Sequence, residues 1–107
     1  MIKPSKVKFI SDELEKDFNL LKDDDFIKKA IIRAIKDLKE NAFCGVQIPK
    51  KLFPREYVQK YGINNLWKYD LPDGWRLIYS VAGSEVSIVA IILEWLPHKD
   101  YERRFKY

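Results

Sequence analysis

Cysteine and histidine are almost absent from this chain, which has one of each in 107 residues, Cys44 and His98. A single cysteine excludes an internal disulfide and is typical of proteins in a reducing compartment. These two residues also fall short of the cysteine and histidine set that a structural zinc site needs. We therefore expect a cytoplasmic protein that uses no metal and no other cofactor.

Long hydrophobic runs are missing as well. The longest apolar stretch, residues 86–96, contains Ser87 and Glu94 and is too short to span a bilayer. The first nine residues are charged and lack the apolar run of a signal peptide. These two absences predict a soluble chain with no membrane partner.

The chain does have enough apolar side chains for a core, because 47% of its residues are hydrophobic and 14% are aromatic. Its length suits one domain better than two, so we expect a single domain over residues 1–107. The 20 lysines and arginines exceed the 16 acidic residues and give a net charge of +4. This charge is compatible with a polyanionic partner but does not establish one.

The first forty residues predict a strand and two helices. Residues 6–10 suit a short edge strand, and Ser11 followed by two acids suits the start of a helix. We expect an αα-hairpin packed on a sheet, with the lysines of the second helix, over 25–41, facing solvent. The apolar residues that recur with helical spacing are Ile10, Leu14, Phe18 and Leu21, then Ile27, Ala30, Ile31, Ala34, Ile35 and Leu38.

Residues 43–65 are less regular. Pro54 can open a short helix that runs to Tyr61 and ends at Gly62. Basic and aromatic residues alternate here, and two interpretations stay open: an RNA-binding surface, or aromatic side chains that fix an irregular connection to the core. The residues concerned are Lys50, Lys51, Arg55 and Lys60, with Phe53, Tyr57 and Tyr61 between them.

The last third predicts three antiparallel strands, at 67–71, 75–81 and 86–95. Alternating apolar residues mark the first two, and Pro72-Asp73-Gly74 between them is a turn pattern. A second turn is expected over 82–85, and the third strand is apolar almost throughout, which is typical of a central strand. We therefore expect an α+β fold with a mainly antiparallel four-stranded sheet and a short basic C-terminal tail.

The first of these hairpins has a geometric consequence. If Pro72-Asp73-Gly74 is the loop, Asp70 faces Arg76 across the two strands. The two residues then either form an exposed ion pair, or the carboxylate orients the guanidinium for a ligand, with Lys68 on the same face. The sequence leaves both interpretations open.

The tail begins with His98, which is followed by Lys99, Tyr101, Arg103 and Arg104. Histidine is suited to proton transfer near neutral pH, and arginine is suited to gripping phosphate oxygens. This cluster predicts chemistry on a phosphodiester. The alternative is that His98 is an exposed residue without a task, while the tail packs against the sheet through Tyr101 and Phe105.

The order of these elements resembles the RelE/ParE superfamily of toxin–antitoxin toxins. The specific match runs from residues 66–68 (LWK) through 74–79 (GWRLIY) to 98–101 (HKDY). The resemblance implies a RelE-like fold. For the RNA-cleaving members it also implies a metal-independent endoribonuclease that acts on messenger RNA, typically in the ribosomal A site.

The resemblance implies roles for individual residues. Arg76 matches the strand arginine that contacts the scissile phosphate, and Lys68 matches a lysine of the preceding strand. His98 or Lys99 matches the basic residue after the last strand, and Tyr101 is the candidate for the tail aromatic. Some relatives use a glutamate base, for which Glu56 is a candidate. The expected RNA-binding residues are Lys50, Lys51, Lys99, Arg103 and Arg104.

Two residues depart from the family pattern. Asp70 stands where several members carry a second lysine, and Phe105 aligns with the final tyrosine. They keep two alternatives open: a non-nucleolytic, ParE-like inhibitor of DNA gyrase, or a degenerate toxin that only binds its antitoxin. In every case the resemblance implies an antitoxin protein as partner and contact with DNA only through that complex. The nuclease would also bind messenger RNA and the ribosome.

Overall fold

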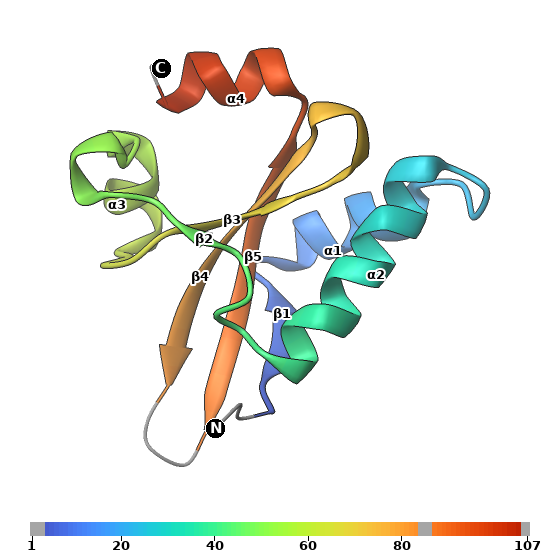
Figure 1. The fold of residues 1–107 in the computed structure, drawn as a ribbon, viewed down its shortest axis with the longest axis horizontal. Helices are drawn as coiled ribbons and strands as arrows, with labels where there is room; N and C mark the ends of the chain where they lie inside the picture. The colour runs from blue at the N-terminus through green and yellow to red at the C-terminus, as the bar shows by residue number, and fades with distance from the viewer. Residues whose placement is uncertain (1–3, 84–86, 106–107) are drawn as a thin grey trace.

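One mixed five-stranded sheet forms the centre of the computed structural model, which describes residues 4–83 and 87–105 (Figure 1). The strand order is β1-β5-β4-β3-β2, in which β1 is parallel to β5 and the other pairs are antiparallel. The strands are β1 (Lys6–Phe9), β2 (Val46–Gln47), β3 (Trp67–Asp70), β4 (Arg76–Gly83) and β5 (Ile88–Leu96).

Four α-helices and two short 3-10 turns complete the described chain. The helices are α1 (Asp12–Leu20), α2 (Phe26–Glu40), α3 (Arg55–Tyr61) and α4 (His98–Phe105), and the turns are η1 (Lys50–Leu52) and η2 (Pro72–Gly74). The α+β class and the αα-hairpin are confirmed, and β1 lies at an edge of the sheet as expected.

One expectation was wrong in detail. The sheet has five strands and not four, because residues 46–47 pair with β3 and add a strand at that edge. The basic tail, to which the sequence analysis assigned no secondary structure, is a regular helix, α4. The predicted strand start at Val86 and part of the predicted turn over 82–85 lie outside the described residues.

The two faces of the sheet carry separate cores. On one face, α1 and α2 cover the inward side of the β3–β4 hairpin and of β5. Capping fixes where both helices begin: the Ser11 hydroxyl accepts from the Leu14 N–H at 3.1 Å, and the Asp25 carboxylate accepts from the Ile27 N–H at 2.8 Å. The fully buried residues of this core include Ile31, Ala34, Leu38, Leu77, Tyr79 and Ile92.

The other face is covered by α3 and α4, so the sheet lies between two helical layers (Figure 1). Tyr101 and Phe105 of α4 are 3% and 1% exposed, and their rings are 4.7 Å apart. They lie one helical turn apart on the same side of α4 and bury it against the sheet. The remaining buried members of this core are Ile48, Tyr57, Leu66, Ile78, Leu93 and Leu96.

The β3–β4 hairpin has the predicted register. Asp70 pairs with Arg76, and the Leu71 N–H donates to the Trp75 carbonyl at 2.8 Å. Two successive positive φ angles, 58° at Asp73 and 80° at Gly74, turn the chain. Aspartate and glycine are residues that adopt this conformation at low cost.

A β-bulge in β5 changes which face its last residues occupy. Ile78 pairs with Glu94 while Tyr79 pairs with Ile92, so Leu93 is the extra residue. Because of this extra residue, Leu93 and Glu94 both lie on the face covered by α4. The bulge therefore brings the one acidic side chain of an apolar strand to the α4 side. Among residues 4–83 and 87–105, no helix is long and apolar enough to cross a membrane.

Candidate functional site

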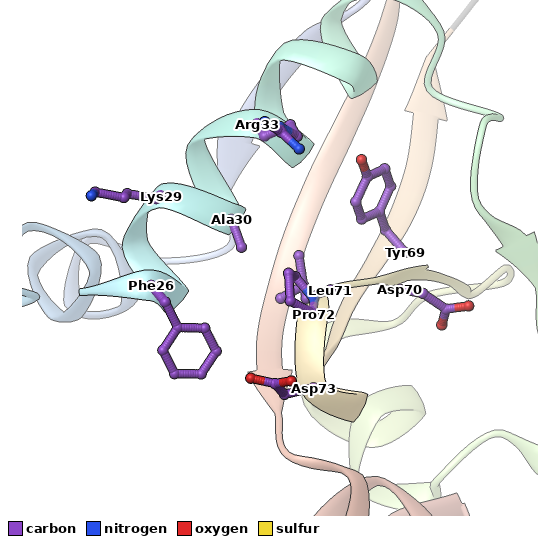
Figure 2. A pocket seen from close by; sticks show the side chains of 9 residues that line it. All are labelled: Phe26, Lys29, Ala30, Arg33, Tyr69, Asp70, Leu71, Pro72 and Asp73. Atoms are coloured by element: carbon purple, nitrogen blue, oxygen red, sulfur yellow. The ribbon is translucent and has the colours of Figure 1, made fainter. Parts of the chain in front are cut away.

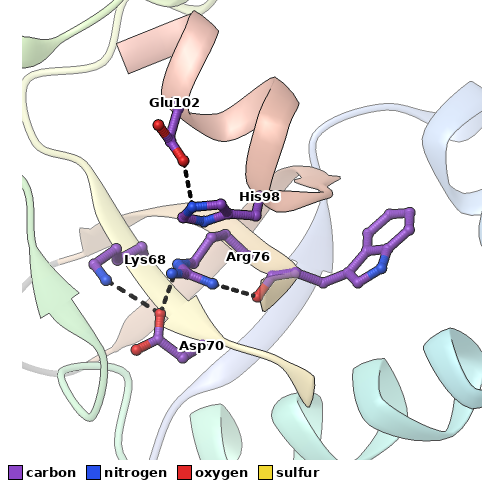
Figure 3. Close-up of polar contacts among 6 residues, drawn as sticks. Lys68, Asp70, Arg76, His98 and Glu102 are labelled. Carbon is purple, nitrogen blue, oxygen red and sulfur yellow. Dashed lines mark hydrogen bonds and ion pairs between the residues drawn. The ribbon is translucent and has the colours of Figure 1, made fainter. Parts of the chain in front are cut away.

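Two cations of neighbouring strands converge on one carboxylate oxygen beneath α4 (Figure 3). Lys68 Nζ of β3 lies 3.1 Å from Asp70 Oδ1, and Arg76 Nε of β4 lies 3.0 Å from the same atom. Alternation along β3 and the pairing of Asp70 with Arg76 place all three side chains on this face. The structure therefore brings together Lys68 and Arg76, as the sequence predicts, with Asp70 between them.

The guanidinium of Arg76 is only partly used by the protein. Its Nη1 donates to the Trp75 carbonyl at 3.3 Å. Its Nε is buried, and the N–H finds no acceptor, because Asp70 Oδ1 is close but not in the direction of that N–H. The contact with Asp70 is an ion pair without a directed hydrogen bond, and a donor of Arg76 remains unsatisfied.

Tyr101 forms an aromatic surface beside these two cations. Its ring centre lies 5.8 Å from Lys68 Nζ and 5.4 Å from Arg76 Cζ. Both distances are in the range of cation–π attraction. Tyr101 is nearly fully buried, so its ring is fixed in place. The ring therefore positions the two cations and also holds α4 against the sheet.

His98, the first residue of α4, is an exposed titratable group beside the cluster, with 54% of its side chain accessible. Its Nε2 pairs with the carboxylate of Glu102, one turn further along the helix (Figure 3). The start of α4 also lies against η2, since a Cβ added at Gly74 would be 3.0 Å from His98 Cβ. Glu102 was not singled out from the sequence, because its spacing from His98 has meaning only once the tail is known to be helical.

The other candidate residues fall into two groups. Lys50 and Lys51 lie exposed in η1, and Lys99 and Arg103 lie exposed on α4. Arg104, in contrast, is engaged by acidic residues of two other elements. Its Nη1 lies 2.7 Å from Glu94 Oε2, and its Nε lies 3.1 Å from Glu56 Oε1.

The environment of Glu94 perturbs the titration of its carboxyl group. Burial raises the pKa of Glu94, and nearby Glu56 raises it as well, whereas Arg104 opposes both effects. Arg104 also lies over the Tyr57 ring, 5.7 Å from its centre, and donates to the Tyr57 hydroxyl at 3.3 Å. Glu56, a candidate base from the sequence, is therefore placed in the contact that joins α3 to α4.

A second feature, not anticipated from the sequence, is a cleft of about 720 Å³ on the α2 side of the hairpin (Figure 2). Phe26 and Ala30 of α2 form one wall, and Leu71 and Pro72 form the other. The Tyr69 hydroxyl at its edge bonds to the Asp37 carboxylate. Burial, followed by this bond, raises the pKa of Tyr69 to about 12.

Within the described ranges, no group of three or more histidine, cysteine, aspartate or glutamate side chains is placed to hold a metal ion. Comparison of the chain with known protein families, with curated proteins and with solved structures finds no match. The geometry of the Lys68–Asp70–Arg76 cluster and of its neighbours is therefore the main indication of function in this chain.

Proposed function

We propose that this chain is an RNA-cleaving toxin of the RelE/ParE type, an endoribonuclease that acts on messenger RNA without a metal. The observation that carries the proposal is the convergence of Lys68 and Arg76 on one oxygen, at 3.1 and 3.0 Å. Two cations held around a single anionic atom, with an exposed histidine on the adjoining helix, suit a phosphodiester.

The proposed reaction begins with attack of an RNA 2′-oxygen on the adjacent phosphorus. The bond from phosphorus to the 2′-oxygen forms while the bond to the 5′-oxygen breaks, which leaves a 2′,3′-cyclic phosphate and a 5′-hydroxyl. Arg76 and Lys68 stabilise the extra negative charge on the phosphorane. His98 carries out one of the two proton transfers, either from the 2′-hydroxyl or to the leaving 5′-oxygen, and solvent water takes or gives the other proton.

In this mechanism Tyr101 keeps a place in the site but has a different role from the one that the resemblance implies. A ring that is 3% exposed cannot readily present its hydroxyl to a substrate, whereas it does contact both cations. Tyr101 is therefore a positioning residue for Lys68 and Arg76. Phe105 is 1% exposed and acts with it to seat α4.

The proposed RNA path uses exposed cations outside the cluster. Lys99 and Arg103 on α4, with Lys50 and Lys51 in η1, are exposed and are the proposed contacts for RNA phosphates. Arg104 contributes indirectly, because its guanidinium is already paired with Glu94 and Glu56. The proposed partners are the ribosome and an antitoxin, and DNA is reached only through the antitoxin complex.

A second candidate function is a non-nucleolytic toxin on the same fold, either a gyrase inhibitor or a degenerate member that only binds its antitoxin. The observation that favours it is the position of Asp70, whose carboxylate offsets the charge of both cations. A protein that performs no phosphodiester chemistry would not need Lys68 and Arg76 to be available to a ligand, so their pairing with Asp70 would cost it no activity. The two candidates differ in whether Arg76 and His98 are needed for toxicity.

Inducible expression of the wild type, Arg76→Ala and His98→Ala, with mapping of RNA 5′ ends, tests the proposal. We expect growth arrest and new 5′-hydroxyl ends with the wild type, and a loss of both in the two variants. Arg33→Ala is the matched control, because Arg33 is exposed on α2, which covers the other face of the sheet from the cluster. Undiminished toxicity in both variants would reject the nuclease, and inhibition of gyrase supercoiling in vitro would then favour the second candidate.

A further inference from the structure

The anionic atom at the centre of the site belongs to the protein itself. Asp70 Oδ1 is the point on which Lys68 Nζ and Arg76 Nε converge. We propose that Asp70 is a built-in competitor for the phosphate, so that a phosphodiester enters only by displacing this carboxylate. The inference depends on the proposed function for the identity of the ligand, and it adds a means of regulating the same site.

The two cations stay in place when the carboxylate leaves. Their side chains are only 20% and 17% exposed, for Lys68 and Arg76 respectively. Arg76 is held by the Trp75 carbonyl, and the Tyr101 ring lies against both cations. The positive site is therefore formed in advance and does not need Asp70 to assemble it.

Asp70 itself is free to move. Its side chain is 58% exposed, and it occupies the last position of β3, directly before the turn. Exposed ion pairs contribute little to stability, so turning this side chain toward solvent costs little free energy. A rotation about its first side-chain torsion moves the carboxylate out of the position between the cations.

A phosphate group satisfies the site better than Asp70 does. The Arg76 Nε–H has no acceptor while Asp70 is in place, although Oδ1 lies only 3.0 Å from the nitrogen. A tetrahedral anion offers more oxygens in more directions, and a guanidinium bonds phosphate with two donors at once. A phosphodiester can therefore accept from this N–H and still contact Lys68.

This arrangement predicts that removal of the Asp70 charge tightens anion binding rather than weakening it. The probe is a single-stranded pentadeoxynucleotide, which lacks the 2′-hydroxyl and cannot be cleaved by the proposed reaction. Binding is followed through the Arg76 Nε–H resonance in NMR titrations of the full chain. For Asp70→Asn we expect the dissociation constant to fall by about three- to tenfold. A change of this size corresponds to the loss of one exposed ion pair that competes with the probe, together with the loss of one negative charge that repels it.

Asp73→Asn is the matched control. It removes the same charge from the neighbouring turn, and asparagine tolerates the positive φ of 58° at that position. We expect its dissociation constant to stay within about twofold of the wild type, since Asp73 is at the surface and the effect there is that of net charge alone. Asp70→Ser, with a shorter neutral side chain, is a second variant in case Asp70→Asn folds poorly.

Equal or weaker binding by both Asp70 variants would overturn the inference, because Asp70 would then orient the cations. An equal gain in Asp73→Asn would also overturn it, because net charge would be the cause. These outcomes are separate from the fate of the proposed function. If Asp70→Asn binds DNA more tightly but the wild type cleaves no RNA, the competitor stands and the nuclease does not. If the wild type cleaves RNA and Asp70→Asn binds DNA no more tightly, the nuclease stands and the competitor role of Asp70 does not.

Discussion

Arg104 of α4 reaches across the sheet face to Glu94 of β5, with 2.7 Å between Nη1 and Oε2. The same guanidinium pairs with Glu56 of α3, so one side chain joins three elements. The contact exists because the bulge at Leu93 turns Glu94 toward α4. The contact leaves the Glu94 carboxylate partly buried beside the Arg104 cation, and this burial has a consequence for stability.

The first prediction is a dependence of stability on pH that Glu94 causes. Burial raises the pKa of Glu94 above its ordinary value of 4.5, so the folded state binds this proton more strongly than the unfolded state. The contribution of Glu94 to the free energy of unfolding is therefore full below pH 4.5 and is lost as the pH rises through the raised pKa. Denaturant unfolding between about pH 4 and 8 should show a steeper decline for the wild type than for Glu94→Gln.

The control for this prediction is Glu40→Gln, a change of the same kind at an exposed position at the end of α2. Its profile should run parallel to that of the wild type. Parallel profiles for Glu94→Gln and the wild type would mean that Arg104 fully offsets the burial of Glu94.

The second prediction separates the two roles of Tyr101. Tyr101→Phe keeps the ring against Lys68 and Arg76, so the proposed RNA cleavage should stay within about threefold of the wild type. Tyr101→Ala removes a nearly buried ring and should lower the free energy of unfolding by about 3–5 kcal/mol. Cleavage rates and denaturation curves of both variants provide the measurement. If Tyr101→Phe is folded and inactive, the hydroxyl takes part in proton transfer.

The third prediction concerns Gly45, which lies directly before β2. A Cβ at this position would be 2.4 Å from the Lys68 carbonyl oxygen and 2.6 Å from the Tyr79 hydroxyl. The nearer atom belongs to the backbone of β3 and cannot rotate away, so Gly45→Ala should cost about 1–3 kcal/mol of stability. Thermal unfolding measures the cost. An unchanged melting temperature would indicate that β2 can move away from β3 without loss.

The fourth prediction is a late titration of one tyrosine. With a pKa of about 12, Tyr69 should ionise well after an ordinary tyrosine, whose pKa is 10.0. The neutral form is favoured in the folded state, so its contribution to stability is present below pH 10.0 and is lost as the pH rises toward 12. The difference in near-ultraviolet absorbance between the wild type and Tyr69→Phe isolates this titration. Asp37→Asn should bring it to lower pH, because the charged acceptor is gone.

The sequence predicted the hairpin and its register well, because local chemistry decides them. Pro72-Asp73-Gly74 admits the turn that the positive φ angles require, and alternation along the strands then places Asp70 opposite Arg76. The two amphipathic helices were predicted for a similar reason, since their apolar residues repeat with helical spacing. The candidate pair of Lys68 and Arg76 followed directly from these elements.

The missed features depend on contacts between distant parts of the chain. β2 has two residues, too few to show any alternation, and it exists because Val46 and Gln47 find β3. The tail was predicted to be basic, but it was assigned no secondary structure, although the spacing of Tyr101 and Phe105 is a local signal for the helix. The pairing of Glu94 with Arg104 depends on a bulge that no sequence period reveals.

The pairing of β1 with β5 has a consequence for the order in which the sheet can fold. Lys6 lies beside Val89 in a parallel pair, so β1 and its partner are far apart in the sequence. A contact of this kind closes a long loop and forms slowly, whereas β3 and β4 are joined by the short turn η2. We therefore expect β1 to add to the sheet after the β3–β4 hairpin has formed. The Lys68–Asp70–Arg76 cluster uses no residue of β1 and can be assembled before that last strand is in place.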